Sequence, residues 1–287
     1  MNKRPFIILS AFLLLFSLIE KGQATETYRP ETSVAGFIQL PGSGRQVYNF
    51  NPGWRFFRGD VRGAEAVNFD DRSWNVVSTP HTVELMPAEG SGCRNYQGPA
   101  WYRKHFVLPA ETKGQRVVLH FEAAMGKQIL YLNGKRIQEH LGGYLPFTLD
   151  LTANGVQAGD SCLLAVFTDN SDDKSYPPGK RQYTLDFAYH GGIYRDVWMI
   201  AKSPIAITDA IDSQTEVQND DARSESVIVE TTLTDADGKV IKRSSGKLSL
   251  KPGEKKSIRQ QMEVKNPTLW SPDTPYLYRV QSRIKKG

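Results

Sequence analysis

The chain has 287 residues and a formal net charge of +5 at pH 7, and 39% of its residues are hydrophobic. This length suits one large domain or two ordinary domains. The positive excess is small and spread along the chain, so a nucleic acid is not expected as a partner. The two cysteines, Cys93 and Cys162, could form one disulfide in an exported protein, although neither their spacing nor their surroundings shows that they pair.

Residues 1–24 have the pattern of a signal peptide. A positive start at Lys3 and Arg4 precedes an apolar run over Phe6–Ile19, and small residues follow where a signal peptidase would cut. The run is short for a membrane span of about 20 apolar residues, so an uncleaved anchor is the weaker alternative. We therefore expect a periplasmic or secreted protein, with no membrane association after signal cleavage and an N-terminal extension over residues 25–46.

Residues 47–203 predict a β-sandwich. Short β-branched and aromatic runs alternate with turn signals, and no stretch keeps helical periodicity over three turns. The clearest runs are Arg116–Phe121, Gln128–Leu132, Leu163–Thr168 and Val197–Ile200. Asn133-Gly134 predicts a tight hairpin, because both residues tolerate a positive φ.

The strand pattern restarts after Lys202-Ser203-Pro204, which we interpret as a domain boundary. Further strand-like runs, among them Ser226–Thr234, then recur around turns such as Asp235–Gly238 and Pro252-Gly253. A last alternating run covers Tyr276–Ile284. This spacing predicts a smaller immunoglobulin-like β-sandwich over residues 204–287.

A series of motifs resembles glycoside hydrolase family 2, the β-galactosidase and β-glucuronidase family. The motifs occur in the family's order and are Trp74–His81 (WNVVSTPH), Gly98–Phe106 (GPAWYRKHF), Tyr131–Lys135 (YLNGK), Gly142–Phe147 (GGYLPF), Asp169–Ser171 (DNS), Gly191–Trp198 (GGIYRDVW) and Asn266–Tyr278 (NPTLWSPDTPYLY). Each is weak alone, but as an ordered series they extend the resemblance over roughly residues 47–287. The resemblance implies an all-β chain, with a jelly-roll sugar-binding domain followed by an immunoglobulin-like domain.

The resemblance also implies a (β/α)8 barrel after these domains, carrying two catalytic glutamates. Retaining hydrolysis needs two carboxyl groups about 5–5.5 Å apart, and this chain has neither an Asn-Glu dipeptide nor a βα alternation. We therefore assign no catalytic residue, metal or cofactor, interpret Glu84, Glu89 and Glu122 as solvated, and expect the chain alone to be inactive. The missing barrel would be its partner. In the family the second sandwich has one more strand, so we expect this one to be incomplete and prone to self-association.

Two residues are candidate sugar contacts. Asp186 lies six positions before Gly192 and matches an aspartate that the family carries from a first-domain loop into the active site. A carboxylate suits this task because it accepts short, charge-assisted hydrogen bonds from hydroxyl groups. The alternative is a loop aspartate that bonds local backbone N–H groups. Asn95 is a second candidate, since some family members place an asparagine shortly before the Trp-Tyr-Arg strand.

The function that the resemblance favours is the non-catalytic N-terminal portion of a β-galactosidase acting in carbohydrate catabolism, with a β-galactoside or related glycan as ligand. One alternative is the same portion of a β-glucuronidase or β-mannosidase. Another is a stand-alone carbohydrate-binding module, which would require exposed aromatic rings on a concave face. The tryptophans of the first domain could supply such rings, but each lies in or near a family motif and suits core packing better; they are Trp54, Trp74, Trp101 and Trp198.

Overall fold

The computed structural model describes residues 31–32, 44–85, 95–185, 187, 189–211, 214–269 and 271–287, with side chains from residue 44 on, except over 206–211. Nearly all of the regular structure is β, and the two described helices are single 3-10 turns, η1 (Ala110–Thr112) and η2 (Gln182–Thr184). No described helix is long and apolar enough to cross a membrane. The expected signal peptide lies outside the described residues and stays a prediction.

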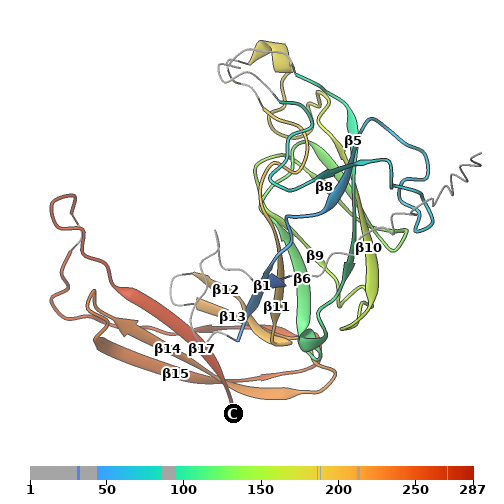
Figure 1. Cartoon of the computed structure of the whole chain (residues 1–287). Coiled ribbons are helices and arrows are strands. Elements are labelled where there is room, and N and C mark those ends of the chain that lie inside the picture. Colours follow the sequence, from blue (N-terminus) through green and yellow to red (C-terminus); the bar gives the residue numbers. More distant parts are fainter. Residues whose placement is uncertain are drawn as a thin grey trace, which may run out of the picture.

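Two antiparallel sheets form the first sandwich (Figure 1). The five-stranded sheet has the order β1 (Glu31–Thr32), β2 (Gln46–Asn49), β11 (Val197–Lys202), β6 (Arg116–Phe121) and β9 (Phe147–Asp150). The six-stranded sheet has the order β4 (Asn75–Val77), β3 (Trp54–Arg58), β5 (Pro99–Val107), β10 (Ser161–Asp169), β7 (Lys127–Leu132) and β8 (Lys135–Leu141). Strands distant in sequence pair in both sheets, as the jelly-roll prediction requires.

The core of this sandwich lies between the two sheets. Strands β6 and β7 alternate buried and half-buried residues, so one side of each strand faces the core. Aromatic rings fill much of it: Phe50 meets Phe106 edge to face at 5.1 Å, and Phe121 stacks on Phe147 at 4.7 Å between ring centroids. Cys162 is a free thiol buried in this core, and Cys93 lies outside the described residues.

Strand β5 buries charged residues on both of its faces. Tyr102, Lys104 and Phe106 point into the core between the sheets, while Trp101 and Arg103 lie under the segment that connects β3 to β4. The Lys104 side-chain amino group donates to the backbone oxygens of Phe50, at 2.8 Å, and of Pro52. It also lies 4.3 Å from the centre of the Phe50 ring. Burial lowers the pKa of Lys104 to about 6.

The buried amine should make the stability of the first sandwich depend on pH. The pKa of Lys104 is lower in the folded chain than the unfolded value of about 10.4, so the unfolded chain binds more protons between these values. The free energy of unfolding should rise from about pH 6 to pH 10 by up to about 1.4 kcal/mol per pH unit. Urea titrations across this range should show the slope, and Lys104→Met should reduce it markedly. Lys113→Met, at an exposed lysine, should retain it, and an unchanged slope in Lys104→Met would contradict the assignment.

The second sandwich consists of two three-stranded antiparallel sheets. Their orders are β12 (Ile205–Ile211), β13 (Gln214–Asn219), β16 (Lys255–Arg259), and β15 (Val240–Leu250), β14 (Glu225–Thr234), β17 (Arg279–Lys286). A small core of Val217, Val227, Val229 and Leu250 joins them. The strand expected over Tyr276–Ile284 begins three residues later, at Arg279. Before it, the Tyr276 hydroxyl accepts a hydrogen bond from the Ala236 N–H in the β14–β15 turn at 3.4 Å.

A polar contact links the two sandwiches. Arg116 of β6 donates to Asp150, 2.5 Å away, and to Asp220 in the second sandwich. The backbone N–H of Asp220 in turn donates to the Pro204 oxygen at 3.2 Å. One guanidinium thereby joins β6 to the turn after β13.

Candidate functional site

Several loops meet at one end of the first sandwich, which is marked by the short helix η2 in Figure 1. Backbone hydrogen bonds run from His81 to the Ile193 oxygen (2.8 Å) and from Val83 to the Gly191 oxygen (3.0 Å). The segments that gather here are residues 81–85, 95–98, 170–185, 187 and 189–193, and we call this region the loop end. It contains Asn95, one of the two predicted sugar contacts.

Asn95 lies in the loop end with its side-chain amide bonded to the opposite loop. Its Nδ2 donates to the Tyr189 backbone oxygen at 2.6 Å, and its Oδ1 accepts from Nε2 of Gln182. The side chain is half-buried. The contacts tie residues 95–98 to the loop that carries position 186, so Asn95 holds the loop whether or not it also meets a sugar.

A second set of contacts joins the same loops through Asp172. Its Oδ1 accepts from Nε2 of Gln97 at 2.8 Å and from the backbone N–H of Gln182 at 3.0 Å, and the Tyr189 hydroxyl lies 3.4 Å away. Burial alone would raise the pKa of Asp172, but these three hydrogen bonds outweigh it and lower the pKa. The carboxylate is therefore ionised at neutral pH. The motifs gave no signal for this network.

Asp186 lies outside the described residues, so its role as a sugar contact stays a prediction. Its neighbours Leu185 and Phe187 belong to the connection between η2 and β11. The side chain of Phe187 is 45% exposed.

Exposed apolar side chains also lie on the loops at this end of the sandwich. The loop between β8 and β9 joins the loop end because Gly142 donates to the Gly126 oxygen at 2.9 Å and the Tyr194 hydroxyl donates to the Gly143 oxygen. The exposed large hydrophobic residues on these loops are Leu85, Tyr144, Leu145, Tyr183 and Phe187. Apolar side chains with a few fixed polar groups are the usual composition of a small-molecule site. The loop end can therefore contact both the C–H faces and the hydroxyl groups of a sugar.

Two glycines let the last loop approach the sheet closely. A Cβ on Gly191 would lie 2.6 Å from Nδ2 of Asn170, whose Oδ1 accepts from the Gly98 N–H at 3.0 Å. A Cβ on Gly192 would lie 2.3 Å from the Tyr102 hydroxyl, and the φ of Gly192 is +99°. The hydroxyl of Tyr102 is itself 2.9 Å from Nδ1 of His81. The Gly-Gly pair thus has a steric role next to the site.

The glutamates considered above have structural partners. Glu84 forms an ion pair with Arg58 at 3.2 Å and accepts from the Tyr96 backbone at 2.6 Å. Glu122 accepts from Nε1 of Trp198 at 3.0 Å. Glu89 lies outside the described residues. Across the described part of the chain, no three His, Cys, Asp or Glu side chains gather closely enough to hold a metal ion.

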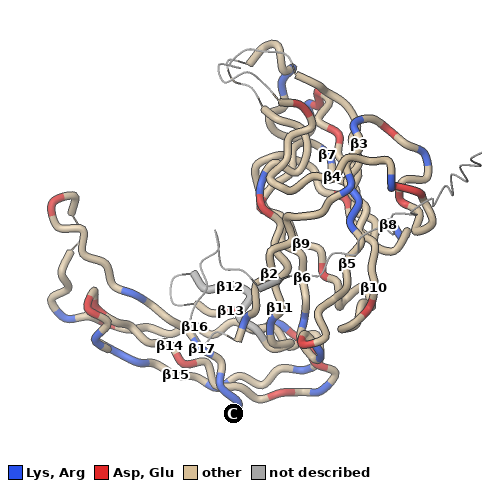
Figure 2. Tube along the Cα trace, viewed as in Figure 1, with Lys and Arg blue, Asp and Glu red and all other residues tan. Residues whose placement is uncertain are grey.

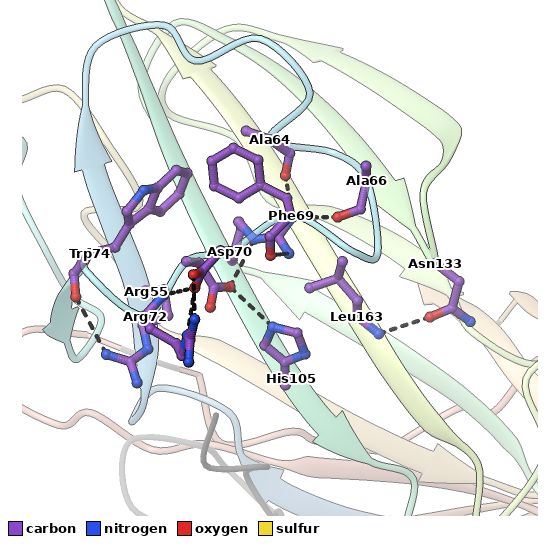
Figure 3. Close-up of polar contacts among 12 residues, drawn as sticks. Arg55, Ala64, Ala66, Phe69, Asp70, Arg72, Trp74, His105, Asn133 and Leu163 are labelled. Atoms are coloured by element: carbon purple, nitrogen blue, oxygen red, sulfur yellow. Dashed lines mark hydrogen bonds and ion pairs between the residues drawn. The ribbon is translucent and has the colours of Figure 1, made fainter. Parts of the chain in front are cut away.

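A separate ionisable cluster occupies the outer face of β5 (Figure 3). Arg103 donates from Nε to Oδ2 of Asp71 at 2.8 Å, and Nε2 of His105 lies 3.0 Å from the same oxygen. Arg103 and Asp71 are 0% and 1% exposed. The other guanidinium nitrogens donate to backbone oxygens of the β3–β4 connection, at Ala64, Ala66 and Phe69. All three guanidinium nitrogens of Arg103 donate to residues of the β3–β4 connection. The cluster therefore stabilises the fold and is not a ligand site.

The predicted packing of the tryptophans is confirmed. Their exposed fractions are 0% for Trp54, 7% for Trp74, 4% for Trp101 and 2% for Trp198. These rings cannot form the exposed platform that a tryptophan-based binding module needs.

Two family models match consecutive parts of the chain. Residues 64–204 match the sugar-binding domain of glycosyl hydrolases family 2, and residues 195–287 match a second model of glycosyl hydrolases family 2.

Curated relatives and solved structures agree with these matches. A β-glucuronidase of Formosa agariphila is 29% identical over 86% of this chain, and a β-galactosidase of Thermoanaerobacter pseudethanolicus is 32% identical over 84%. The crystal structure of a Bacteroides uniformis β-glucuronidase matches with a TM-score of 0.73 and 29% identity, over 84% of this chain. The chain spans only 29%, 33% and 30% of the lengths of these proteins. The chain belongs to glycosyl hydrolase family 2, of which it carries the sugar-binding jelly roll and the immunoglobulin-like domain.

Proposed function

We propose that this chain is the sugar-contacting, non-catalytic portion of an exported family 2 glycosidase that removes terminal β-galactosyl or β-glucuronyl residues. The loop end carries the proposal, because polar groups held by Asn95 and Asp172 lie among exposed aromatic side chains there. The sugar classes come from relatives named β-galactosidase and β-glucuronidase. Export rests on the signal-peptide pattern of residues 1–24.

In this proposal the loop end orients the sugar and does not cleave the glycosidic bond. Cleavage with retention requires an acid/base carboxyl and a nucleophilic carboxylate on either side of the bond. Glu84 and Glu122 are already engaged with Arg58, Tyr96 and Trp198, which leaves neither poised for that chemistry. A barrel domain that supplies the two carboxylates is therefore the proposed partner of the chain.

One observation favours a second candidate, in which the chain binds sugar by itself. Tyr144, Tyr183 and Phe187 expose 42%, 54% and 45% of their surfaces on the loop end. Such rings could hold a sugar without any further domain. Binding of a monosaccharide glycoside to the chain alone would favour this module, whereas binding that needs the barrel would favour the first candidate.

Substituting Asp186 should test the sugar contact. We expect Asp186→Asn, in this chain joined to a family 2 barrel, to weaken binding of methyl β-galactoside or methyl β-glucuronide about 10- to 100-fold, because a hydrogen bond to a charged group contributes about 1.5–3 kcal/mol. Isothermal titration calorimetry measures the affinity, and thermal unfolding checks the fold. Asp237→Asn, in a surface turn of the second sandwich, is the matched control. Equal affinities for Asp186→Asn and the control would overturn the assignment of Asp186.

A further inference from the structure

The sheet β15–β14–β17 of the second sandwich has one buried and one exposed face. Val227, Val229, Thr231 and Leu233 of β14 are buried, whereas Ile228, Glu230 and Thr232 are half-buried. The alternation therefore assigns these three residues to the outer face. Their cross-strand partners lie on the same face. The outer face therefore consists of Ile228, Glu230 and Thr232 with Arg243, Ser245 and Lys247 of β15 and Gln281, Arg283 and Lys285 of β17.

The register concentrates positive charge on this face. Ile228 lies between Lys247 and Lys285, and Thr232 lies between Arg243 and Gln281. Arg279 extends the row on β17, opposite Thr234. The five basic side chains of the face are all exposed, and Figure 2 shows Lys and Arg residues along these strands.

Glu230 is the only acidic residue that the described residues of these three strands place on the outer face. Its carboxylate is 2.9 Å from Nζ of Lys285. The hydrogen bond from Lys285, together with the charges of Lys285, Arg243 and Arg283, lowers the pKa of Glu230. Three cations thus surround one carboxylate, and the face keeps a net positive charge at neutral pH.

The geometry of the face suits a repeating anion. Side chains at i and i+2 on a strand are about 6.6–6.8 Å apart, and neighbouring strands are about 4.8 Å apart, so the cations form a flat grid. Guanidinium groups bind carboxylates and other oxyanions through two parallel hydrogen bonds. The face carries no aromatic ring on which nucleic-acid bases could stack, and only Ile228 is apolar, which leaves little to insert into a membrane.

We propose that the outer face of the β15–β14–β17 sheet binds an anionic polysaccharide through Arg243, Lys247, Arg279, Arg283 and Lys285. Because the same chain carries a sugar-binding domain, we favour an anionic glycan over other polyanions as the ligand. Binding here would hold a charged polymer beside the protein independently of the loop end. The proposal goes beyond the proposed function and does not depend on it.

Calorimetry of the full chain with two polymers tests this site. Polygalacturonate carries carboxylates and dextran sulfate carries sulfates, and neutral dextran is the blank. We expect at least one charged polymer to bind at 50 mM NaCl. Its affinity should fall strongly at 300 mM NaCl, because salt screens exposed charges. Arg243→Gln/Arg283→Gln should reduce the affinity about 5- to 30-fold, since exposed pairs contribute modestly each. Glu230→Gln should raise it.

The control is Arg62→Gln/Arg259→Gln, which removes two exposed arginines outside the face and should leave the affinity unchanged. Equal losses in the two double variants would overturn the proposal, as would binding to dextran that matches the charged polymers. Tighter binding to duplex DNA or to phosphatidylglycerol vesicles than to either polymer would also overturn it. Asp186→Asn should not alter this binding, so failure at the loop end and failure at this face can be told apart.

Discussion

Replacing Asp71 with alanine should lower the free energy of unfolding of the first sandwich by about 3–5 kcal/mol, because it leaves the fully buried Arg103 guanidinium without its carboxylate. The remaining donors of Arg103 reach only backbone oxygens of Ala64, Ala66 and Phe69. The β3–β4 connection that these oxygens belong to covers Trp101. Loss of the carboxylate should therefore destabilise the packing of the whole β3–β4 connection on β5, in addition to removing one ion pair. Urea unfolding measures the change.

The neighbouring aspartate provides the control. Asp70 pairs with Arg72 at 2.7 Å, but both side chains are more than half exposed. Asp70→Ala should leave the free energy of unfolding nearly unchanged, because exposed ion pairs contribute little. If Asp70→Ala and Asp71→Ala lowered the free energy of unfolding by similar amounts, the buried ion pair would contribute no more to stability than the exposed one.

Lowering the pH should remove the contribution of Asp71 to the free energy of unfolding. Burial alone would raise its pKa, but the hydrogen bonds from His105 and Arg103 outweigh burial and lower it below the unfolded value of about 3.9. The folded chain therefore holds the ionised form more strongly, and this stability is present above pH 4 and lost as the pH falls through the folded pKa. The difference between the parent chain and Asp71→Ala should shrink over that acidic range.

The pattern of Gly98–Phe106 predicted a strand but not the burial of both of its basic side chains, Arg103 and Lys104. Alternation on β5 sends Lys104 to one face and Arg103 to the other. An ordinary two-layer sandwich would expose one of these faces. The β3–β4 connection adds a third layer over Arg103, and nothing in its sequence periodicity indicates that it folds back. Tertiary packing therefore decided the environment of a residue that the motif had placed correctly along the chain.

Tight turns were predictable because they depend on neighbouring residues. Asn133 and Gly134 have φ angles of 51° and 81°, as the Asn-Gly hairpin signal requires. The loop end was not predictable in the same way. Gln97 and Asp172 are 75 positions apart and meet only because β5 and β10 are paired neighbours. The family motifs pointed to Asn95, yet they gave no sign that its amide is bonded to Gln182 and Tyr189.

Gly192→Ala should destabilise the first sandwich by about 3 kcal/mol or more, since it combines steric overlap with an unfavourable φ. The added methyl group would lie 2.3 Å from the hydroxyl of Tyr102 and 3.2 Å from the backbone oxygen of His81. The Tyr102 side chain is fully buried and cannot move aside. The Met125 N–H donates to the Gly192 oxygen at 3.0 Å. Displacing this backbone should therefore also disturb the loop end.

Two further variants separate the causes. Gly155 has a φ of +85° with open space around its Cβ position, so Gly155→Ala should lose only the backbone part, about 1–2 kcal/mol. Tyr102→Phe removes the hydroxyl, and in that background Gly192→Ala should cost measurably less than in the parent chain. Urea unfolding of the parent chain, the two single variants and the double variant gives the coupling between the two positions. If Gly192→Ala costs no more than Gly155→Ala, or the same with and without the Tyr102 hydroxyl, close approach to that hydroxyl is not what requires glycine at position 192.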